Sequence, residues 1–209
     1  MSTKTTANGP RRLVLGSTSR YRRALLERLG LPFVVAAPDL DETALPSETA
    51  AQTALRLAEA KARAVAAHYP DSLVIGSDQV ADCAGQPIGK PGSRERAVDQ
   101  LQTLSGKTVV FHTAVALVDA GSGRCRTALV DVASTFRTLS PAEIAAYLDR
   151  EEPYDCAGSV KSEGLGIALF ERIASDDPTA LIGLPLIALT RLLREEGVDV
   201  LAPAASLTA

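Results

Sequence analysis

The sequence predicts an α/β fold, because short apolar runs that suit strands alternate with amphipathic or alanine-rich runs that suit helices. The alternation continues along most of the 209 residues, and no repeat, low-complexity tract or linker interrupts it. A single domain over residues 11–200 is therefore expected, with flexible tails at 1–10 and 202–209.

Strand, helix, strand and helix are expected in turn in the first third of the chain, at residues 12–16, 19–29, 33–36 and about 49–67. Gly30 suits the end of the first helix, because glycine readily adopts the left-handed conformation that closes helices. Ser47 or Thr49 can cap the second helix, which its many alanines favour. The loop at 38–46 precedes that helix and carries three carboxylates.

The middle of the chain is expected to form a strand, a loop, a helix and two strands, at residues 73–76, 85–91, 93–104, 109–118 and 127–137. Residues 77–80 follow the first of these strands directly. Ser93 caps the helix. The Gly-Ser-Gly turn at 121–123 predicts a β-hairpin.

The C-terminal part is expected to form a helix, an irregular segment, a strand and a final helix, at residues 140–150, 151–161, 165–173 and 184–196. The first of these helices has a clear start signal. Ser140 stands at the cap position, Pro141 follows it, and Glu143 can complete a capping box.

Composition excludes several classes of partner. The 22 Lys and Arg against 25 Asp and Glu give a net charge of −3, so no global positive field for nucleic acid is expected. No apolar run approaches the roughly 20 residues of a membrane span. The polar first ten residues do not resemble a signal peptide, and Cys83, Cys125 and Cys156 are odd in number and far apart. A reduced, cytoplasmic protein is expected.

The first candidate site lies where the first strand meets the first helix. Free backbone N–H groups at a helix N-terminus attract anions, and the hydroxyls of Ser17 and Ser19 add donors beside them. Three arginines, including Arg22, occupy a first turn in which acidic residues are usual, which indicates an anion supplied from outside. The alternative is that Ser19 only caps the helix and the arginines face solvent.

Carboxylates supply the second group of candidates. Asp78 comes just past an apolar strand, where α/β folds place ligands, and could orient a metal or accept a proton from water. Asp41 and Glu42 could provide oxygen ligands for Mg²⁺ or Mn²⁺ beside phosphates. Alternatively, Asp78 bonds its own backbone in a turn, and the loop pair is simply solvated.

Lysines complete the charge pattern. Lys61 stands in the alanine-rich helix, and a rigid Gly-Lys-Pro loop presents Lys90. With Arg22 they would match a triphosphate of about four negative charges, although each lysine could instead be an ordinary exposed one. The polar cluster at 161–164 precedes an apolar run, so it could line a pocket or form a surface turn.

Taken together, the chain resembles the Maf family of nucleoside triphosphate pyrophosphatases over about residues 12–197. The resemblance rests on seven motifs: Ser17-Thr18-Ser19-Arg20-Tyr21-Arg22, Asp41-Glu42-Thr43, Leu57-Ala58-Glu59-Ala60-Lys61-Ala62, Gly76-Ser77-Asp78-Gln79-Val80, Gly89-Lys90-Pro91, Leu104-Ser105-Gly106 and Ala157-Gly158-Ser159-Val160-Lys161-Ser162-Glu163-Gly164. It implies a Maf/ITPase-like fold of two lobes around a mixed β-sheet, with a nucleotide-binding cleft between them. A homodimer is compatible with it.

The resemblance also implies a reaction and roles for the residues. A nucleotide would be cleaved between its α and β phosphates, giving a nucleoside monophosphate and pyrophosphate. Asp78 would accept the proton of the attacking water, and Glu42 and Asp78 would hold a divalent metal cation, Mg²⁺ or Mn²⁺. The phosphate-binding groups would be Ser17, Arg22, Lys61 and Lys90.

The motifs around Asp78 and Glu163 resemble the branch of that family that acts on 7-methyl-GTP and removes modified nucleotides. Tyr21, Gln79 and Glu163 fall at the positions that set base choice. An aromatic face attracts a cationic methylated base, and a carboxylate can accept the N1–H and N2–H bonds of guanine. That branch often has Trp where Tyr21 stands and Phe where Val160 stands. The alternatives are the dTTP/UTP branch and a non-catalytic nucleotide-binding regulator linked to septum formation.

Overall fold

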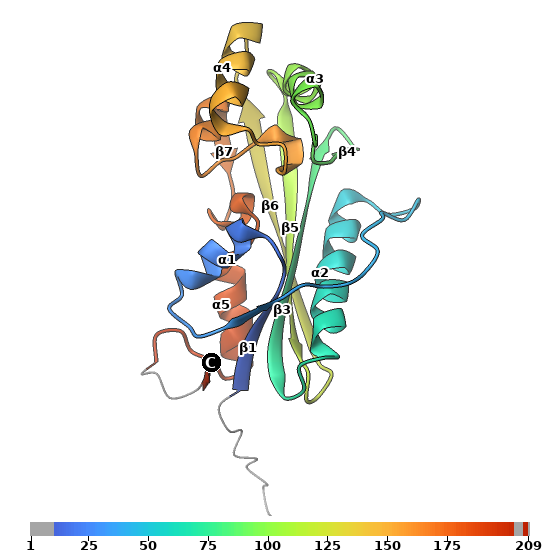
Figure 1. The fold of residues 1–209 in the computed structure, drawn as a ribbon, viewed down its shortest axis with the longest axis vertical. Coiled ribbons are helices and arrows are strands. Elements are labelled where there is room, and N and C mark those ends of the chain that lie inside the picture. The colour runs from blue at the N-terminus through green and yellow to red at the C-terminus, as the bar shows by residue number, and fades with distance from the viewer. Residues whose placement is uncertain (1–10, 203–206, 209) are drawn as a thin grey trace, which may run out of the picture.

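The computed structural model describes residues 11–202 and 207–208, and its centre is one mixed β-sheet in the order β2-β1-β3-β5-β6-β7 (Figure 1). β4 pairs with β3, and β8 pairs with β1. The strands are β1 (Arg11–Gly16), β2 (Val34–Ala36), β3 (Ser72–Cys83), β4 (Gln86–Ile88), β5 (Thr108–Asp119), β6 (Cys125–Phe136), β7 (Phe170–Ala174) and β8 (Leu207–Thr208). The α-helices are α1 (Arg20–Glu27), α2 (Ala50–Ala66), α3 (Arg94–Leu104), α4 (Pro141–Glu151) and α5 (Leu186–Glu195).

The expected α/β class is confirmed, and α1, α2, α3 and α4 each begin at a residue whose side chain caps the helix. Thr49, rather than Ser47, caps α2, and its side chain and that of Gln52 each accept from the other's backbone N–H. Ser140 and Glu143 make the same reciprocal pair at α4. Such pairs satisfy N–H groups that a helix start otherwise leaves free.

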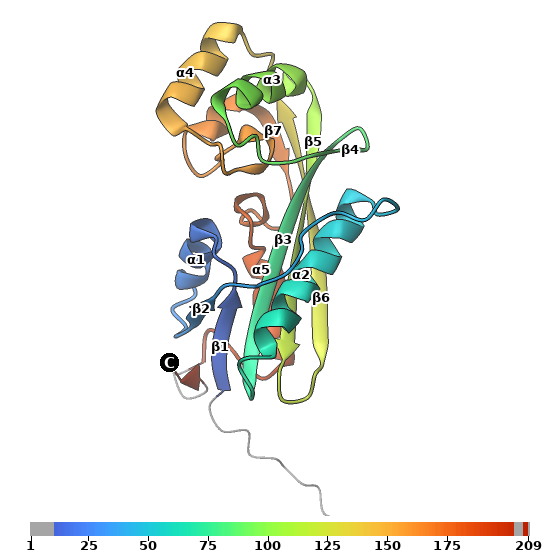
Figure 2. The ribbon, with the colours of Figure 1, turned by 45° about the vertical axis from the view of Figure 1, so that its right-hand side comes forward.

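Two lobes meet along the sheet. In the lower lobe of Figures 1 and 2, α1 and α5 cover one face of the sheet and α2 covers the other, each over its own apolar cluster. In the upper lobe, α3 and α4 pack with β7 over a separate core that includes Phe111 and Phe136. The long strands β3, β5 and β6 run through both lobes.

The expected end of a strand at residue 76 is wrong, because β3 continues to Cys83. β3 runs parallel to β1 as far as the Gly16–Gly76 pair and antiparallel to β5 along nearly all its length. The polar residues that suggested a turn have partners from other elements: the Ser77 hydroxyl lies 2.8 Å from the Ala114 carbonyl oxygen. Asp78 therefore sits inside a strand, two positions beyond the last residue paired with β1.

Two further expectations need correction. The loop expected at 85–91 contains β4, which turns back on β3 through Ala84 and Gly85, both at positive φ, in a two-residue hairpin. The strand expected at 165–173 begins only at Phe170, and a 3₁₀ helix (Leu165–Leu169) precedes it. Other 3₁₀ helices span Ala157–Ser159 and Ala180–Ile182.

The expected tails fall largely outside the described residues, at 1–10, 203–206 and 209. Within the C-terminal tail, Leu207–Thr208 pairs in parallel with Arg11 and Arg12 of β1. No helix in the described part of the chain has the length and apolar character needed to cross a bilayer.

Candidate active site

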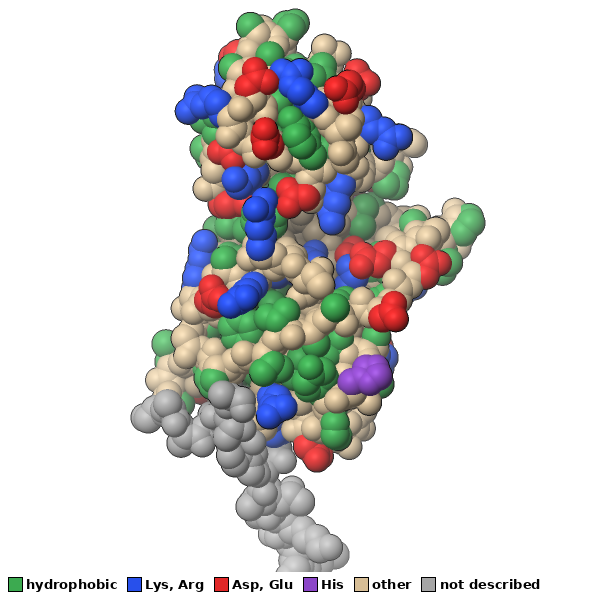
Figure 3. All heavy atoms as spheres, viewed as in Figure 1, with side chains coloured by type: hydrophobic (Ala, Val, Ile, Leu, Met, Phe, Trp, Pro, Cys, Tyr) green, Lys and Arg blue, Asp and Glu red, His purple; other side chains and the backbone are tan. Residues whose placement is uncertain are grey.

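A cavity of about 500 Å³ opens between the lobes, at the N-terminus of α1. Figure 3 shows the surface hollowed there, with basic and acidic side chains around the rim. Six of the residues that the sequence assigns to the site line this cavity. One lobe contributes Ser17, Tyr21, Arg22, Glu42 and Lys61, and the other lobe contributes Lys90. Asp78 does not line this cavity but lies directly behind Lys61.

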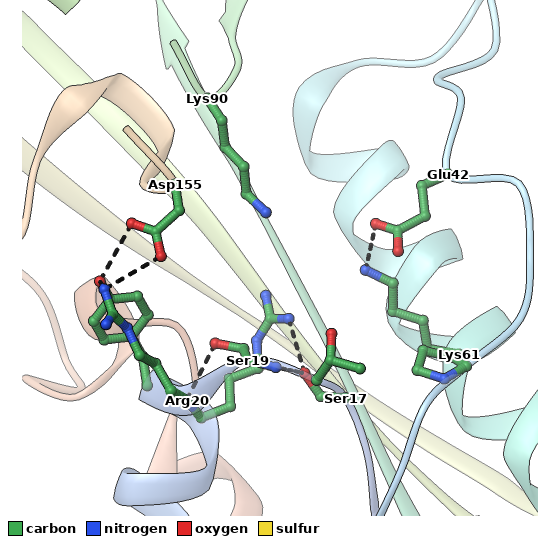
Figure 4. A pocket seen from close by; sticks show the side chains of 11 residues that line it. Ser17, Ser19, Arg20, Glu42, Lys61, Lys90 and Asp155 are labelled. Atoms are coloured by element: carbon green, nitrogen blue, oxygen red, sulfur yellow. Dashed lines mark hydrogen bonds and ion pairs between the residues drawn. The ribbon is translucent and has the colours of Figure 1, made fainter. Parts of the chain in front are cut away.

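The two serines of the turn before α1 make different hydrogen bonds. Ser19 caps the helix, its hydroxyl accepting from the Arg22 backbone N–H at 3.4 Å. Ser17 is 4% exposed, and its hydroxyl oxygen accepts from the Ser19 N–H at 3.2 Å and from Arg22 Nη1 at 3.4 Å. The two hydroxyls thus hold the turn in place, and both serines lie at the floor of the cavity (Figure 4), where Ser17 contacts the guanidinium of Arg22.

The arginines of the first helical turn have different partners. Arg23 pairs with Glu27 at 2.9 Å on the exposed face of α1. Arg20 lies 3.4 Å from Asp155 of the other lobe. Among the described residues, Arg22 has no carboxylate within 4 Å. The sequence-based expectation that an anion completes the charge of this turn therefore applies to Arg22 alone.

Arg22 is held for such an anion. Its Nε donates to the carbonyl oxygen of Gly183 at 2.9 Å, which fixes the direction of the guanidinium. Burial lowers the pKa of Arg22, and the charges of Asp78 and Glu42 act in the opposite direction. A half-buried cation without a directly bound carboxylate is a strong site for phosphate, since Arg–phosphate hydrogen bonds are charge-assisted.

Lys61 is the centre of a buried ionic cluster. Its ammonium lies 2.7 Å from Asp78 Oδ1 and 2.6 Å from Glu42 Oε2. Lys61 is 4% exposed and Asp78 7%, whereas the Glu42 side chain is half exposed at the cavity wall. An ammonium has three N–H donors, so one remains for a ligand after the two carboxylates are bound. Lys61 is therefore not an ordinary exposed helix lysine.

The reach of Lys61 depends on how closely α2 lies on β3. A Cβ added at Gly76 would come within 2.1 Å of the Ala58 carbonyl oxygen and 2.6 Å of the Ala62 nitrogen. Ala54, Ala58 and Ala62 are fully buried on this face. Because β3 has a glycine and α2 has alanines at this contact, the two backbones pack closely. Lys61 on α2 can therefore reach the Asp78 carboxylate on β3.

Glu42 and Asp78 suit a divalent cation. One oxygen of each carboxylate contacts the Lys61 ammonium, so the two oxygens lie close to the same point. Within residues 11–202 and 207–208 no three His, Cys, Asp or Glu side chains form a metal-binding group. Mg²⁺ commonly takes one or two carboxylates and completes its shell with water and substrate phosphates, so the pair fits this mode. Asp41 is occupied elsewhere, accepting from the Thr43 N–H and hydroxyl at 2.9 and 2.6 Å.

Lys90 enters the cavity from the opposite lobe (Figure 4). Its exposed side chain has no carboxylate within 4 Å in the described part of the protein. The preceding Gly89 carbonyl accepts from Gly158 N–H at 3.3 Å and from Gln100 Nε2 at 3.0 Å, which anchors the loop. Lys90 is thus a second cation without a carboxylate partner in the described residues, and it lines the same cavity as Arg22 from the other lobe.

A smaller pocket of about 100 Å³ adjoins the cavity, and all three residues expected to set base choice line it. Gln79 is fixed by its amide nitrogen, whose two N–H groups are shared among Thr113 Oγ1 at 2.9 Å and the carbonyl oxygens of Ala180 and Leu181 at 2.9 and 3.0 Å. Its amide oxygen is left as an acceptor. Glu163 is exposed, and the structure gives its carboxylate no ion pair among the described residues.

Sequence reasoning missed Asp155 and the residues that orient Gln79. Asp155 lines both the cavity and the smaller pocket. It stands in the segment expected to be irregular, and nothing in its neighbours singles it out. Thr113 and the Ala180 carbonyl lie far from Gln79 in sequence, so only the folded chain reveals their contact.

The chain is similar to known proteins over nearly its whole length. A model of the family described as "Maf-like protein" matches residues 12–196. A protein of Polaromonas sp. (strain JS666 / ATCC BAA-500) named "7-methyl-GTP pyrophosphatase" is 60% identical over 203 residues, covering 96% of this chain and 93% of its own. Proteins with the same name from Burkholderia orbicola (strain AU 1054) and Bordetella pertussis (strain Tohama I / ATCC BAA-589 / NCTC 13251) are 62% and 59% identical; they cover 88% and 91% of this chain and 90% and 94% of their own.

Among solved structures, the Staphylococcus aureus Ham1 protein aligns with a TM-score of 0.43 and 16% identity, over 61% of this chain and 73% of its own. The family model and the curated relatives decide the assignment, because both extend over both lobes and every site motif. This chain belongs to the Maf family.

Proposed function

We propose that this chain is a pyrophosphatase that hydrolyses 7-methyl-GTP to 7-methyl-GMP and pyrophosphate. The observation that carries the proposal is the cavity itself, which two cations without a carboxylate partner in the described residues, Arg22 and Lys90, line from the two lobes beside the buried Lys61–Asp78 pair. The name and the identity of 59–62% of the relatives support 7-methyl-GTP as the substrate.

The triphosphate would occupy the larger cavity. It brings about four negative charges, which demand fixed cations and N–H donors. Arg22 and Lys90 would bind it from opposite walls, with Ser17 and the third N–H of Lys61 as further donors. Positioning and charge neutralisation supply most of the catalysis in phosphoryl transfer, and both are met by preset groups of this kind.

Asp78 would act as the proton acceptor. Water attacks the α-phosphorus, its proton passes to the Asp78 carboxylate, and the α–β bond breaks with pyrophosphate as the leaving group. A triphosphate offers Lys61 a stronger anion than its present partners, and a shift of the ammonium toward it uncovers Asp78. Glu42 and Asp78 would hold Mg²⁺ or Mn²⁺, which when bound neutralises charge on the phosphates.

The base would occupy the smaller pocket. The Tyr21 ring offers a face to the delocalised positive charge of 7-methylguanine. Glu163 would accept the N1–H and N2–H bonds, and the Gln79 amide oxygen is a further acceptor. A pyrimidine would leave these acceptors poorly paired, which disfavours dTTP and UTP.

Pyrophosphate release from 7-methyl-GTP, GTP, dTTP and UTP, with Mg²⁺ or Mn²⁺, tests the proposal. Wild type should prefer 7-methyl-GTP, Asp78→Asn should abolish turnover, and Asp82→Asn on the same strand should retain it. A preference for dTTP or UTP would assign the other branch. Tight binding without turnover would indicate a non-catalytic regulator, and unchanged turnover in Asp78→Asn would refute the role of Asp78.

A cytoplasmic location and a homodimer remain predictions. Cys83, Cys125 and Cys156 are free thiols in the structure, which agrees with a reducing compartment. Light scattering of the purified protein would determine whether it forms a dimer.

A further inference from the structure

We propose that Asp155 is a second acidic specificity residue, which makes selection of the base depend on its positive charge and holds the Tyr21 ring in place. The inference rests on the proposed function and deepens it. It starts from the position of Asp155 on the upper lobe, between α4 and the Ala157–Ser159 turn, where it faces the N-terminus of α1 across the cleft.

Asp155 bridges the two lobes at the point where the large cavity meets the smaller pocket. One carboxylate oxygen lies 3.4 Å from the Tyr21 hydroxyl, and the other lies 3.4 Å from Arg20 Nη2 (Figure 4). Burial raises the pKa of the Tyr21 phenol, so the hydroxyl keeps its proton and donates to the carboxylate. Asp155 is the one carboxylate shared by both hollows among the residues that the structure describes.

The contacts also arrange the ring of Tyr21. Arg20 Nη2 donates to the Tyr21 hydroxyl at 2.7 Å, and its Cζ lies 4.8 Å from the ring centroid. One ring face is therefore occupied by a guanidinium, which leaves the other for a base. Arg20 lines only the larger cavity, whereas Tyr21 and Asp155 also line the smaller pocket. The Arg20 side chain therefore lies behind the Tyr21 ring and does not line the smaller pocket.

Charge is distributed unevenly along the smaller pocket. Its charged lining residues are Arg22, Lys90 and Asp155, which also line the larger cavity, and Glu163, which lines the smaller pocket alone. Glu163 alone can satisfy the hydrogen bonds of guanine, with or without the 7-methyl group. A second carboxylate adds no necessary hydrogen bond, but it attracts a cationic base more strongly than a neutral one. Asp155 therefore separates 7-methylguanine from guanine by charge.

The test compares 7-methyl-GTP with GTP in Asp155→Asn, Asp155→Glu and Asp149→Asn. Asparagine retains an oxygen acceptor for Tyr21 and Arg20 but removes the charge, and glutamate restores it. Asp149 is the matched control, because it is a 61% exposed α4 carboxylate paired with Arg94, as the 54% exposed Asp155 is paired with Arg20. The assays use mildly acidic pH, where the methylated base keeps its N1 proton.

Asp155→Asn should lower the ratio of kcat/KM for 7-methyl-GTP to that for GTP by about tenfold, mainly through KM for 7-methyl-GTP. Asp155→Glu should keep most of the wild-type ratio, and Asp149→Asn should leave it unchanged. An equal loss on both substrates, no loss on either, or the same change in Asp149→Asn would overturn the inference. Failure of wild type to turn over 7-methyl-GTP would instead refute the proposed function.

Discussion

Replacement of Gly76 by alanine should separate α2 from β3 and thereby dismantle the Lys61–Asp78 pair. The added Cβ would lie 2.1 Å from the Ala58 carbonyl oxygen, whereas ordinary contact begins at 3.4 Å. The oxygen belongs to the backbone, and a Cβ has a position fixed by its own backbone, so the clash cannot be relieved by rotating a side chain. The helix must therefore retreat by about 1 Å, and the 2.7 Å contact of Lys61 with Asp78 becomes too long for a hydrogen bond.

The expected loss of unfolding free energy is about 3 kcal/mol, the upper part of the range for overpacked cores. For a chain of this size it corresponds to a fall in Tm of about 6–12 °C. Activity should fall further than stability predicts, since a displacement of about 1 Å at a catalytic group can reduce the rate about a hundredfold. Urea unfolding and kcat, the latter measured well below the lowered Tm, separate the two effects.

Gly121→Ala is the matched control, because its Cβ would meet only the Asp71 and Asp119 side chains, at 3.4 and 3.5 Å. It should change neither stability nor kcat appreciably. A Gly76→Ala protein with wild-type Tm and kcat would refute the reasoning that close backbone packing positions Lys61. A loss of stability with unchanged kcat would instead refute the claim that the packing of α2 on β3 maintains the Lys61–Asp78 pair for catalysis.

Three other predictions concern single side chains. Ser134 has a fully buried hydroxyl with no hydrogen-bond partner in the described structure. Ser134→Ala should therefore raise the free energy of unfolding, measured with urea, by about 1 kcal/mol. A decrease of that size in the free energy of unfolding would contradict this. Arg22→Met removes a half-buried cation that lacks a carboxylate contact. The variant should therefore be at least as stable as wild type without ligand, and its KM for the triphosphate should rise at least tenfold. A destabilised variant with a normal KM would show that Arg22 is structural. Hydrogen bonds from Ser140 and Arg137 lower the pKa of Glu143 from 4.5 to about 2. A depressed carboxyl pKa stabilises the fold above the unfolded value and loses that effect as pH falls through the folded one, so Glu143→Gln should be less stable than wild type at neutral pH, and the gap should close between pH 4.5 and about 2. A gap that is constant with pH would refute the assignment.

Local signals carried most of the sequence-based prediction. The caps at Ser93 and Ser140 act within three residues, so the helix starts are visible in the chain itself. The site motifs likewise converge as expected, with Tyr21, Gln79 and Glu163 in one pocket.

Several residues were misjudged or missed because the groups that contact them are distant in sequence. Ser77 and Asp78 suggested the end of a strand, but Ala114 and Lys61 satisfy their polar groups and the strand continues. The alternative of an ordinary exposed Lys61 could be excluded only from the structure, because neither of its carboxylates lies on its own helix. Asp155 gained its importance from Tyr21, 134 positions away.

The continuity of β3, β5 and β6 through both lobes has a consequence for how ligands enter. Three continuous strands join the lobes, so rotation of one lobe against the other requires bending of the sheet. Folding therefore already supplies most of the conformational entropy cost of ordering the cavity walls, and little further ordering is needed when the nucleotide binds. Entry and product release should then be limited by diffusion and local loop motion rather than by lobe closure. Because the same three strands carry both walls of the cleft, a substitution far along them should be able to alter catalysis without approaching the substrate.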